Sequence, residues 1–148
     1  MNGKLASIAY AARKGGAIRE TMFAEISVPK GIICDARGHF PKRQITLLFE
    51  ESWVAACADL GRPLPWITRR ANLLIAGMDA AQDRGAQIAV GETLLEVTEE
   101  TTPCNLMEKA APGLMAALKP GWRGGVCCIV LRGGNIAVGD DVIRLMAR

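Results

Sequence analysis

The sequence has one histidine, few aromatic residues and no long apolar run. Phe, Trp and Tyr make up 5% of its 148 residues. A single histidine excludes sites that need two or three, so a histidine-based catalytic triad would have to use His39. The longest uninterrupted apolar run, residues 126–131, is far shorter than the roughly 20 residues that span a bilayer. We therefore expect no membrane partner.

The sequence also lacks a large excess of positive over negative charge. Eighteen Lys and Arg residues oppose fifteen Asp and Glu residues, which leaves a net charge of +3. This bias is too mild to indicate a nucleic-acid partner. Because 50% of the residues are apolar and 22% are charged, disorder is excluded. The length predicts one domain over residues 1–148.

The cysteine pattern indicates a reducing compartment. Five cysteines, an odd number without a CxxC spacing, do not read as a disulfide framework. We expect reduced thiols and a cytoplasmic location. Residues 5–12 are apolar and rich in alanine, but Ser7 and Tyr10 interrupt them, which argues against a signal peptide.

Short strands separated by Gly and Pro turns dominate the predicted secondary structure. Residues 88–97 and 136–145 share one pattern, in which three apolar residues precede Gly, an acid and a second apolar stretch. Each copy predicts a hairpin. Further strands are expected over residues 22–28, 31–34, 44–49 and 126–131, the last buried on both faces. This pattern predicts a mainly β fold, a closed or nearly closed β-barrel with a few short helices.

One helix is predicted from Glu50 to about Leu60. Acidic residues in its first turn complement the positive end of the helix dipole, and Gly61 ends it. Trp53, Cys57 and Leu60 have the spacing of one core-facing stripe.

Cys104 has a chemical context that the other thiols lack. Thr102 is a good N-cap and Pro103 suits the first helical position, which predicts a helix with Cys104 in its first turn. Free backbone amides and the helix dipole there favour a negative charge, which lowers the pKa of a thiol and makes it nucleophilic or metal-binding. The alternative is a buried structural thiol.

The other thiols are expected to be structural, except Cys34, which precedes the loop of residues 35–41 and is harder to place. Core packing is expected for Cys57, Cys127 and Cys128. The helix after Cys104 is expected to break at residues 112–113. Its predicted apolar face consists of Leu106, Ala110, Leu114 and Leu118.

Arginines gather beside glycine-rich segments. Guanidinium groups and free loop amides together suit a phosphate or another planar anion. The alternative is a set of solvated surface side chains. His39 is interpreted as a loop residue. The arginines concerned are Arg37, Arg69, Arg70 and Arg123.

Taken in order, the motifs from roughly Ile26 to the end resemble the MOSC family, named after the C-terminal domain of molybdenum cofactor sulfurase. The chain is similar to the small stand-alone bacterial members. One departure is Cys34, which stands where family members usually have Gly. The motifs are residues 31–38 (GIICDARG), 43–48 (RQITLL), 68–77 (TRRANLLIAG), Val90-Gly91, Thr98 to Pro103-Cys104, 123–126 (RGGV) and Gly139-Asp140.

The resemblance implies a β-barrel of the pyruvate-kinase-barrel type and a functional Cys104. In the family this cysteine is thought to carry sulfur as a persulfide or, in related reductases, to ligate molybdenum. Arg70, Asn72 and Arg123 match polar positions around the presumed site, and Arg37 is included as a further anion-binding candidate. At family level, molybdenum cofactor (molybdopterin) and pyridoxal phosphate binding are also implied.

Three functions follow as hypotheses. The first is sulfur transfer, in which Cys104 accepts a sulfane sulfur and delivers it to a metal–sulfur cofactor or small anionic acceptor. No cysteine-desulfurase domain precedes the motifs, so a desulfurase or another donor protein is the expected partner. The second is a molybdenum-cofactor reductase of N-hydroxylated compounds, with the Cys104 thiolate on the metal. The third is a non-catalytic small-anion-binding module.

Overall fold

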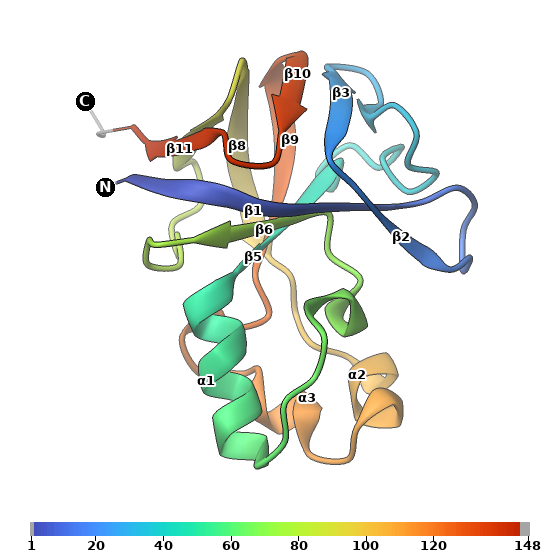
Figure 1. Cartoon of the computed structure of the whole chain (residues 1–148), viewed down its shortest axis with the longest axis vertical. Coiled ribbons are helices and arrows are strands. Elements are labelled where there is room, and N and C mark those ends of the chain that lie inside the picture. Colours follow the sequence, from blue (N-terminus) through green and yellow to red (C-terminus); the bar gives the residue numbers. More distant parts are fainter. Residues whose placement is uncertain (1, 146–148) are drawn as a thin grey trace.

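A barrel of seven strands forms the centre of the molecule in a computed structural model, which describes residues 2–145 (Figure 1). All neighbouring strands are antiparallel except β5 and β6, which are parallel. Pairing of β11 with β1 closes the barrel. Around it the order is β1 (Asn2–Ala11), β11 (Asp141–Arg144), β7 (Gln87–Val90), β8 (Thr93–Glu100), β9 (Val126–Arg132), β5 (Ile45–Phe49) and β6 (Leu73–Ala76). The expected β-barrel with a few short helices is confirmed.

A parallel strand pair needs a crossover, and α1 (Glu50–Leu60) with η1 (Trp66–Arg69) supplies it between β5 and β6. The helix has the predicted bounds. Gly61 ends it with a left-handed φ of 81°, and its N–H donates to the carbonyl oxygens of Cys57 and Ala58. Of the predicted stripe, Trp53 and Cys57 are buried and Leu60 is half-buried.

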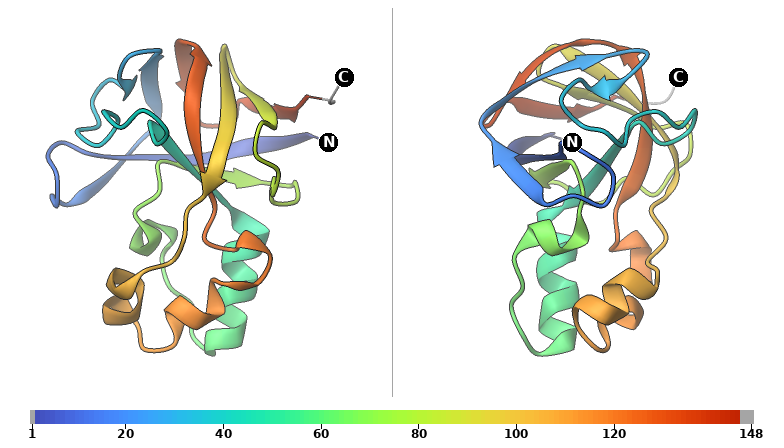
Figure 2. Two further views of the ribbon diagram at one scale, coloured as in Figure 1. Left: turned by 180° about the vertical axis from the view of Figure 1, so that it is seen from behind. Right: turned by 90° about the vertical axis from the view of Figure 1, so that its right-hand side faces the viewer.

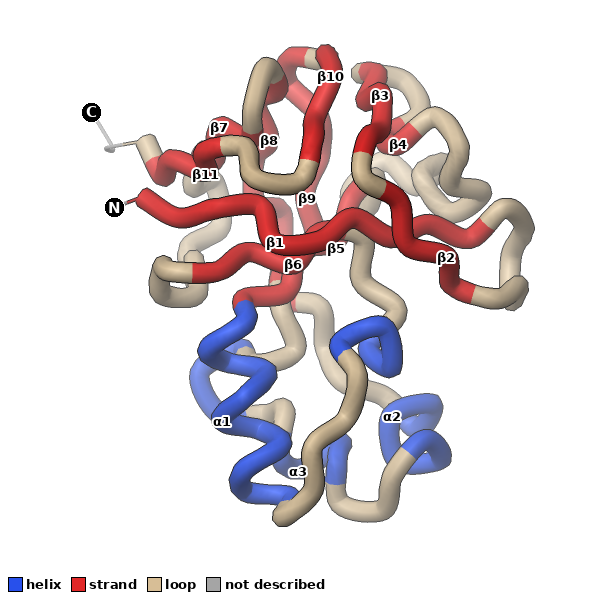
Figure 3. Tube along the Cα trace, in the orientation of Figure 1, coloured by secondary structure: helices blue, strands red, loops and turns tan. Residues whose placement is uncertain are grey.

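The remaining helices lie with α1 at one end of the barrel (Figures 1 and 3). They are α2 (Asn105–Ala110), α3 (Leu114–Ala117) and η2 (Pro120–Trp122). The break at residues 112–113 is confirmed, but the predicted apolar face is only half correct, because Leu106 and Ala110 are exposed while Met107 and Ala111 are buried with Leu114 and Leu118. Among the residues described, none of the helices has the length and apolar character needed to cross a bilayer.

A small sheet covers the opposite end of the barrel (Figure 2). Its order is β10 (Gly134–Ala137), β3 (Phe23–Ser27) and β4 (Gly31–Ile32). The remaining strand, β2 (Ile18–Thr21), forms a hairpin with the second half of β1. The apolar residues 5–12 thus fall mainly in a strand.

Of the two expected hairpins, the first is confirmed and the second is wrong. Strands β7 and β8 pair with each other across Gly91. Strand β10 instead pairs with β3, while β11 joins β7 and β1 in the barrel. The carboxylate of Asp140 accepts the N–H of Ala137 at 2.8 Å, which holds this segment as a corner between two sheets.

The apolar core has two parts, one inside the barrel and one under the helices. Ile45, Leu47 and Phe49 of β5 point into the barrel, while Leu48 packs against the helical layer. Strand β5 is therefore buried on both faces. Strand β9 is buried from Val126 to Cys128, but its far end is exposed at Leu131, so burial of the whole segment on both faces was wrong.

Candidate functional site

A buried polar cluster joins four segments of the chain outside the barrel core. Asn72 is 3% exposed. Its amide oxygen accepts hydrogen bonds from the backbone N–H and the hydroxyl of Thr46, and its amide nitrogen donates to the carbonyl of Ala9 and the carboxylate of Asp35. All four hydrogen-bonding positions of this amide are thus used within the protein. Asn72 therefore holds the site together.

Asp35 anchors one guanidinium group. Its Oδ1 accepts hydrogen bonds from the backbone N–H of Ala11 and from Nε of Arg37, both at 2.9 Å. Nη1 of Arg37 donates to the carbonyl of Arg70 at 2.7 Å. Its Nη2 is buried and has no hydrogen-bond partner within residues 2–145. An unpaired charged donor is costly to bury, so this nitrogen is available to a ligand in the cleft.

Arg70 is held in an unusual backbone conformation. It follows η1 with φ 63° and ψ 28°, the left-handed region that side chains other than Gly rarely adopt. Nη2 donates to the carbonyl of Gly16 at 2.9 Å, so this side chain joins the turn between β1 and β2. Such strain persists only where the surroundings hold it, and it is frequent at functional sites.

Arg37, Arg70 and Asn72 line one cleft of about 170 Å³. Three of the four predicted anion-binding residues therefore lie together. Arg43, Thr46, Phe40 and Gln44 complete the lining. The cleft presents three guanidinium groups and suits a small anion.

Arg123, the fourth, lies elsewhere. Its Nη1 donates to the carboxylate of Asp59 on α1 at 2.6 Å and to the carbonyl of Ala117 on α3 at 3.1 Å. It lines a separate hollow with Glu51 and Gln82. Its role in anion binding stays a prediction.

A row of buried polar side chains runs from the cleft across neighbouring strands. We call Asn72, Thr46, Cys127 and Thr101 the polar row. Thr46 on β5 is paired with Cys127 on β9, and the hydroxyl of Thr101 lies 3.3 Å from the Cys127 sulfur. Strands lie about 4.8 Å apart, so each step along the row is short. The row leads from the cleft to the segment that carries Cys104.

Arg69 holds the far end of this row. It is 7% exposed, and its Nε and Nη2 donate to the carbonyls of Gly124 and Thr101 at 3.0 and 2.7 Å. Burial is the main factor that lowers its pKa, and the Arg43 cation lowers it further, while negative charge at Cys104 acts in the opposite direction. Arg69 is thus a buried cation bound to the segment that leads to Cys104.

Cys104 is exposed, as a reactive thiol must be, but it does not lie in the first turn of a helix. It is the N-cap of α2, with φ −130° and ψ −179°, and the helix begins at Asn105. Thr102 is therefore not the N-cap, and Pro103 is not helical. The helix has six residues, so the long helix dipole expected at Cys104 is absent from this position.

The other thiols differ in exposure. Cys57, Cys127 and Cys128 are buried, as expected, and Cys34 is exposed. Burial raises the pKa of Cys127, which the hydroxyl of Thr101 and the cation of Arg43 partly offset, and burial also raises the pKa of Cys128. His39 is exposed and is not among the residues that line the cleft.

Asp35, Thr46, Arg43 and the role of Arg69 were missed from the sequence. Arg69 was noted only as part of an arginine cluster. The side chains of Arg69 and Arg70 diverge because η1 ends between them, and only Arg70 reaches the cleft. One feature of the sequence could have indicated Asp35, because it lies two residues before Arg37 in an expected loop and its carboxylate could pair with that arginine.

Comparison with known proteins places this geometry in a family. The family model described as MOSC domain matches residues 35–143, a range that contains the cleft, Arg69 and Cys104. A search of the curated proteins gives no match.

Several solved structures share the fold. The YuaD protein of Bacillus subtilis superposes with a TM-score of 0.82 at 19% identity, over 96% of this chain and 94% of that one. YiiM of Geobacillus stearothermophilus gives 0.70 at 18% identity, over 97% and 75% of the two chains. YiiM of Escherichia coli gives 0.73 at 13% identity, over 100% and 71%. At these identities the likeness shows a common fold.

Proposed function

Because the chain belongs to the MOSC domain family, which is linked to the molybdenum cofactor, we propose that it is a sulfur carrier whose Cys104 accepts a sulfane sulfur and passes it to a small anionic acceptor. The observation that carries this proposal is the position of Cys104. It is an exposed thiol that follows Thr101, the end of the polar row, and the carbonyl of Thr101 accepts a hydrogen bond from the buried guanidinium of Arg69. An exposed thiol is accessible to a donor protein, as sulfur exchange requires.

The proposed loading step is a thiol–persulfide exchange without net oxidation. The Cys104 thiolate attacks the outer sulfur of a cysteine persulfide on a donor protein, such as a cysteine desulfurase. The S–S bond of the donor breaks and its cysteine leaves as a thiolate, while a new S–S bond forms on Cys104. The persulfide proton passes to the leaving thiolate or to water. The positive charge of Arg69 would favour the anionic terminal sulfur of the product.

The arginine-lined cleft would hold the acceptor. Arg37 offers its unpaired Nη2, and Arg70 and Arg43 add positive charge. Charge-assisted hydrogen bonds from guanidinium groups suit a phosphate or a comparable oxyanion. Acceptor and thiol would then lie at opposite ends of the polar row.

The fit of the molybdenum cofactor to this cleft is partial. Its phosphate group suits the three guanidinium groups. A cleft of about 170 Å³ is nevertheless smaller than the roughly 300 Å³ or more typical of pockets that bury a ligand of this class. The cleft therefore suits only the phosphate end of such a molecule.

A second candidate function is binding of a small anion without sulfur chemistry. The observation that favours it is the unpaired Nη2 of Arg37, which is available to an anion whether or not Cys104 reacts. This module would bind anions equally well in a Cys104→Ala variant.

Isotope loading separates the two functions. The protein is incubated anaerobically with a cysteine desulfurase and sulfur-labelled cysteine, and its peptides are analysed by mass spectrometry. Labelled persulfide confined to Cys104 supports the sulfur carrier. Absence of label, or label scattered over the five cysteines, contradicts it and favours the anion-binding module.

A further inference from the structure

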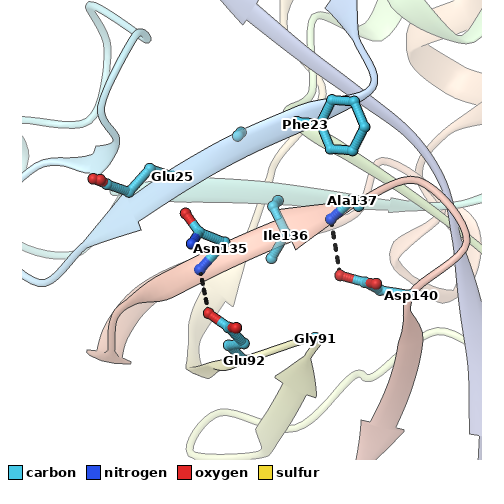
Figure 4. A pocket seen from close by; sticks show the side chains of 9 residues that line it. Phe23, Glu25, Gly91, Glu92, Asn135, Ile136, Ala137 and Asp140 are labelled. Carbon is cyan, nitrogen blue, oxygen red and sulfur yellow. Dashed lines mark hydrogen bonds between the residues drawn. The ribbon is translucent and has the colours of Figure 1, made fainter.

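A second concave surface lies along β3 and β10 (Figure 4). These strands are at the end of the barrel opposite the helices (Figure 1). The surface is a groove of about 680 Å³, bordered by the turn between β7 and β8. Cys104 and α2 lie at the other end of the molecule, so this groove is independent of the proposed sulfur chemistry.

The edge of β10 beside this groove is closed to another strand. The carboxylate of Glu92 accepts the N–H of Asn135 at 2.9 Å, and that of Asp140 accepts the N–H of Ala137 at 2.8 Å (Figure 4). Both N–H groups would otherwise form the free edge of the sheet, since β3 pairs with the other side of β10. Capped edges of this kind prevent strand addition. An occupant must therefore bind through its side chains.

The charged residues that line the groove are all acidic. Glu25, Glu92 and Asp140 line it, and its lining contains no Lys or Arg. Glu25 makes no side-chain hydrogen bond or ion pair to any described residue. Arg132 lies nearby but donates to the backbone carbonyl of Glu92 at 3.3 Å. Three carboxylates thus line one groove in a chain whose net charge is +3, which makes this groove complementary to a cation.

An exposed aromatic ring lies on the same strand as one of these carboxylates. Phe23 is 73% exposed and is two residues from Glu25 on the outer face of β3 (Figure 4). Alternate residues on an extended strand are about 6.6 Å apart. The side chains of an extended peptide have the same repeat, and a guanidinium or ammonium group binds both a carboxylate and an aromatic face.

We propose that this groove docks an extended basic segment of a partner protein. Arg or Lys side chains of the segment pair with Glu25 and with the free carboxylate oxygens of Glu92 and Asp140, while one of its side chains covers the ring of Phe23. The open shape suits a peptide, because a small ligand needs a pocket that encloses most of its surface.

The test uses a fluorescein-labelled peptide of alternating arginine and serine, and the same peptide with glutamine in place of arginine. Anisotropy titrations of the full chain are expected to show binding of the arginine peptide that weakens as salt rises, and much weaker binding of the glutamine peptide. Glu25→Gln should weaken binding about threefold and Phe23→Ala about fivefold. Both side chains are exposed or unpaired, so neither change should affect folding.

Two matched controls lie at the helical end. Glu108 caps the N–H of Gly113 at 2.9 Å as Glu92 caps Asn135, and Val54 is 58% exposed. Glu108→Gln and Val54→Ala should leave peptide binding unchanged. The proposal is overturned if the groove and control variants bind alike or if both peptides bind equally. It is also overturned if sedimentation shows a dimer that Phe23→Ala dissociates, since a second copy would then cover the groove.

Discussion

Nδ2 of Asn72 donates a hydrogen bond of 3.2 Å to Oδ2 of Asp35, although 37 positions separate the two residues. Through this contact β6 is joined to the loop that carries Arg37. The same carboxylate orients the Arg37 guanidinium, and the same amide is bound to Thr46 on β5. The position of the cleft arginine thus depends on a buried network in which every hydrogen-bonding position of the Asn72 amide is used.

Removal of the amide should destabilise the fold. Asn72→Ala leaves the N–H of Thr46, the carbonyl of Ala9 and Oδ2 of Asp35 without this partner. Each unsatisfied buried group costs about 1–3 kcal/mol, so we expect a loss of about 3 kcal/mol or more in the free energy of unfolding. Urea denaturation measures it. Asn105→Ala, at an exposed position, should change it by less than about 0.5 kcal/mol.

Anion binding should depend on Arg37 and not on Arg123. Arg37→Met removes the unpaired Nη2, and charge-assisted hydrogen bonds contribute about 1.5–3 kcal/mol. We expect the affinity for inorganic phosphate, measured by calorimetry at constant ionic strength, to fall at least about tenfold. Arg123→Met should have no effect, because that guanidinium is bound to Asp59. A larger loss of phosphate affinity in the Arg123 variant would show that Arg123 binds the anion, and it would contradict the assignment of anion binding to the cleft.

The charge of Arg69 should promote the reactivity of Cys104. Arg69→Met leaves the carbonyls of Gly124 and Thr101 unpaired and removes the cation, whereas Arg69→Lys keeps a positive charge. Alkylation of Cys104 by iodoacetamide, followed by peptide mass spectrometry, should slow several-fold in the Met variant and less in the Lys variant. Equal rates in both variants would show that the cation does not act on Cys104.

Stability should fall in alkaline solution because of the buried thiols. Burial raises the pKa of Cys127 and Cys128 above the usual value of 9.0. Below pH 9.0 the thiols are protonated in both the folded and the unfolded chain, so their contribution to the free energy of unfolding does not change with pH. Above it the unfolded chain loses the proton that the folded chain retains, so the free energy of unfolding falls.

The slope should reach about 1.4 kcal/mol per pH unit for Cys128, which is fully buried. Cys128→Ala should reduce this slope above pH 9 even though it also removes packing. Urea denaturation between about pH 7 and 10 measures it. An unchanged slope in the variant would contradict the assignment.

Local signals predicted the elements that depend on neighbours in sequence. The helix from Glu50 to Leu60 was predicted because acidic residues begin it and Gly61 ends it, and the hairpin across Gly91 because its turn is short. The corner at Gly139 has a similar sequence, but its strands pair with β3, β7 and β1. No local pattern contains those distant partners, so the same motif gave one correct and one wrong hairpin.

The site was predictable to the extent that its residues share a motif. Arg70 and Asn72 are two positions apart and both line the cleft. Thr46 and Cys127 meet only because β5 pairs with β9, and Arg69 reaches Thr101 only because η1 lies beside the segment after β8. Arg123 follows a strained turn, in which Trp122 has φ 54°, and its side chain reaches α1. Such side-chain directions depend on tertiary packing.

The central claim is that Cys104 carries the sulfur, and Cys34 provides its control. These are the two exposed cysteines, while the other three are buried. The most direct measurement compares labelled sulfur bound after incubation with a cysteine desulfurase and labelled cysteine in Cys104→Ser, Cys34→Ser and the unmodified chain. We predict full loading in Cys34→Ser and loss of loading in Cys104→Ser. Retained loading in Cys104→Ser would contradict the account.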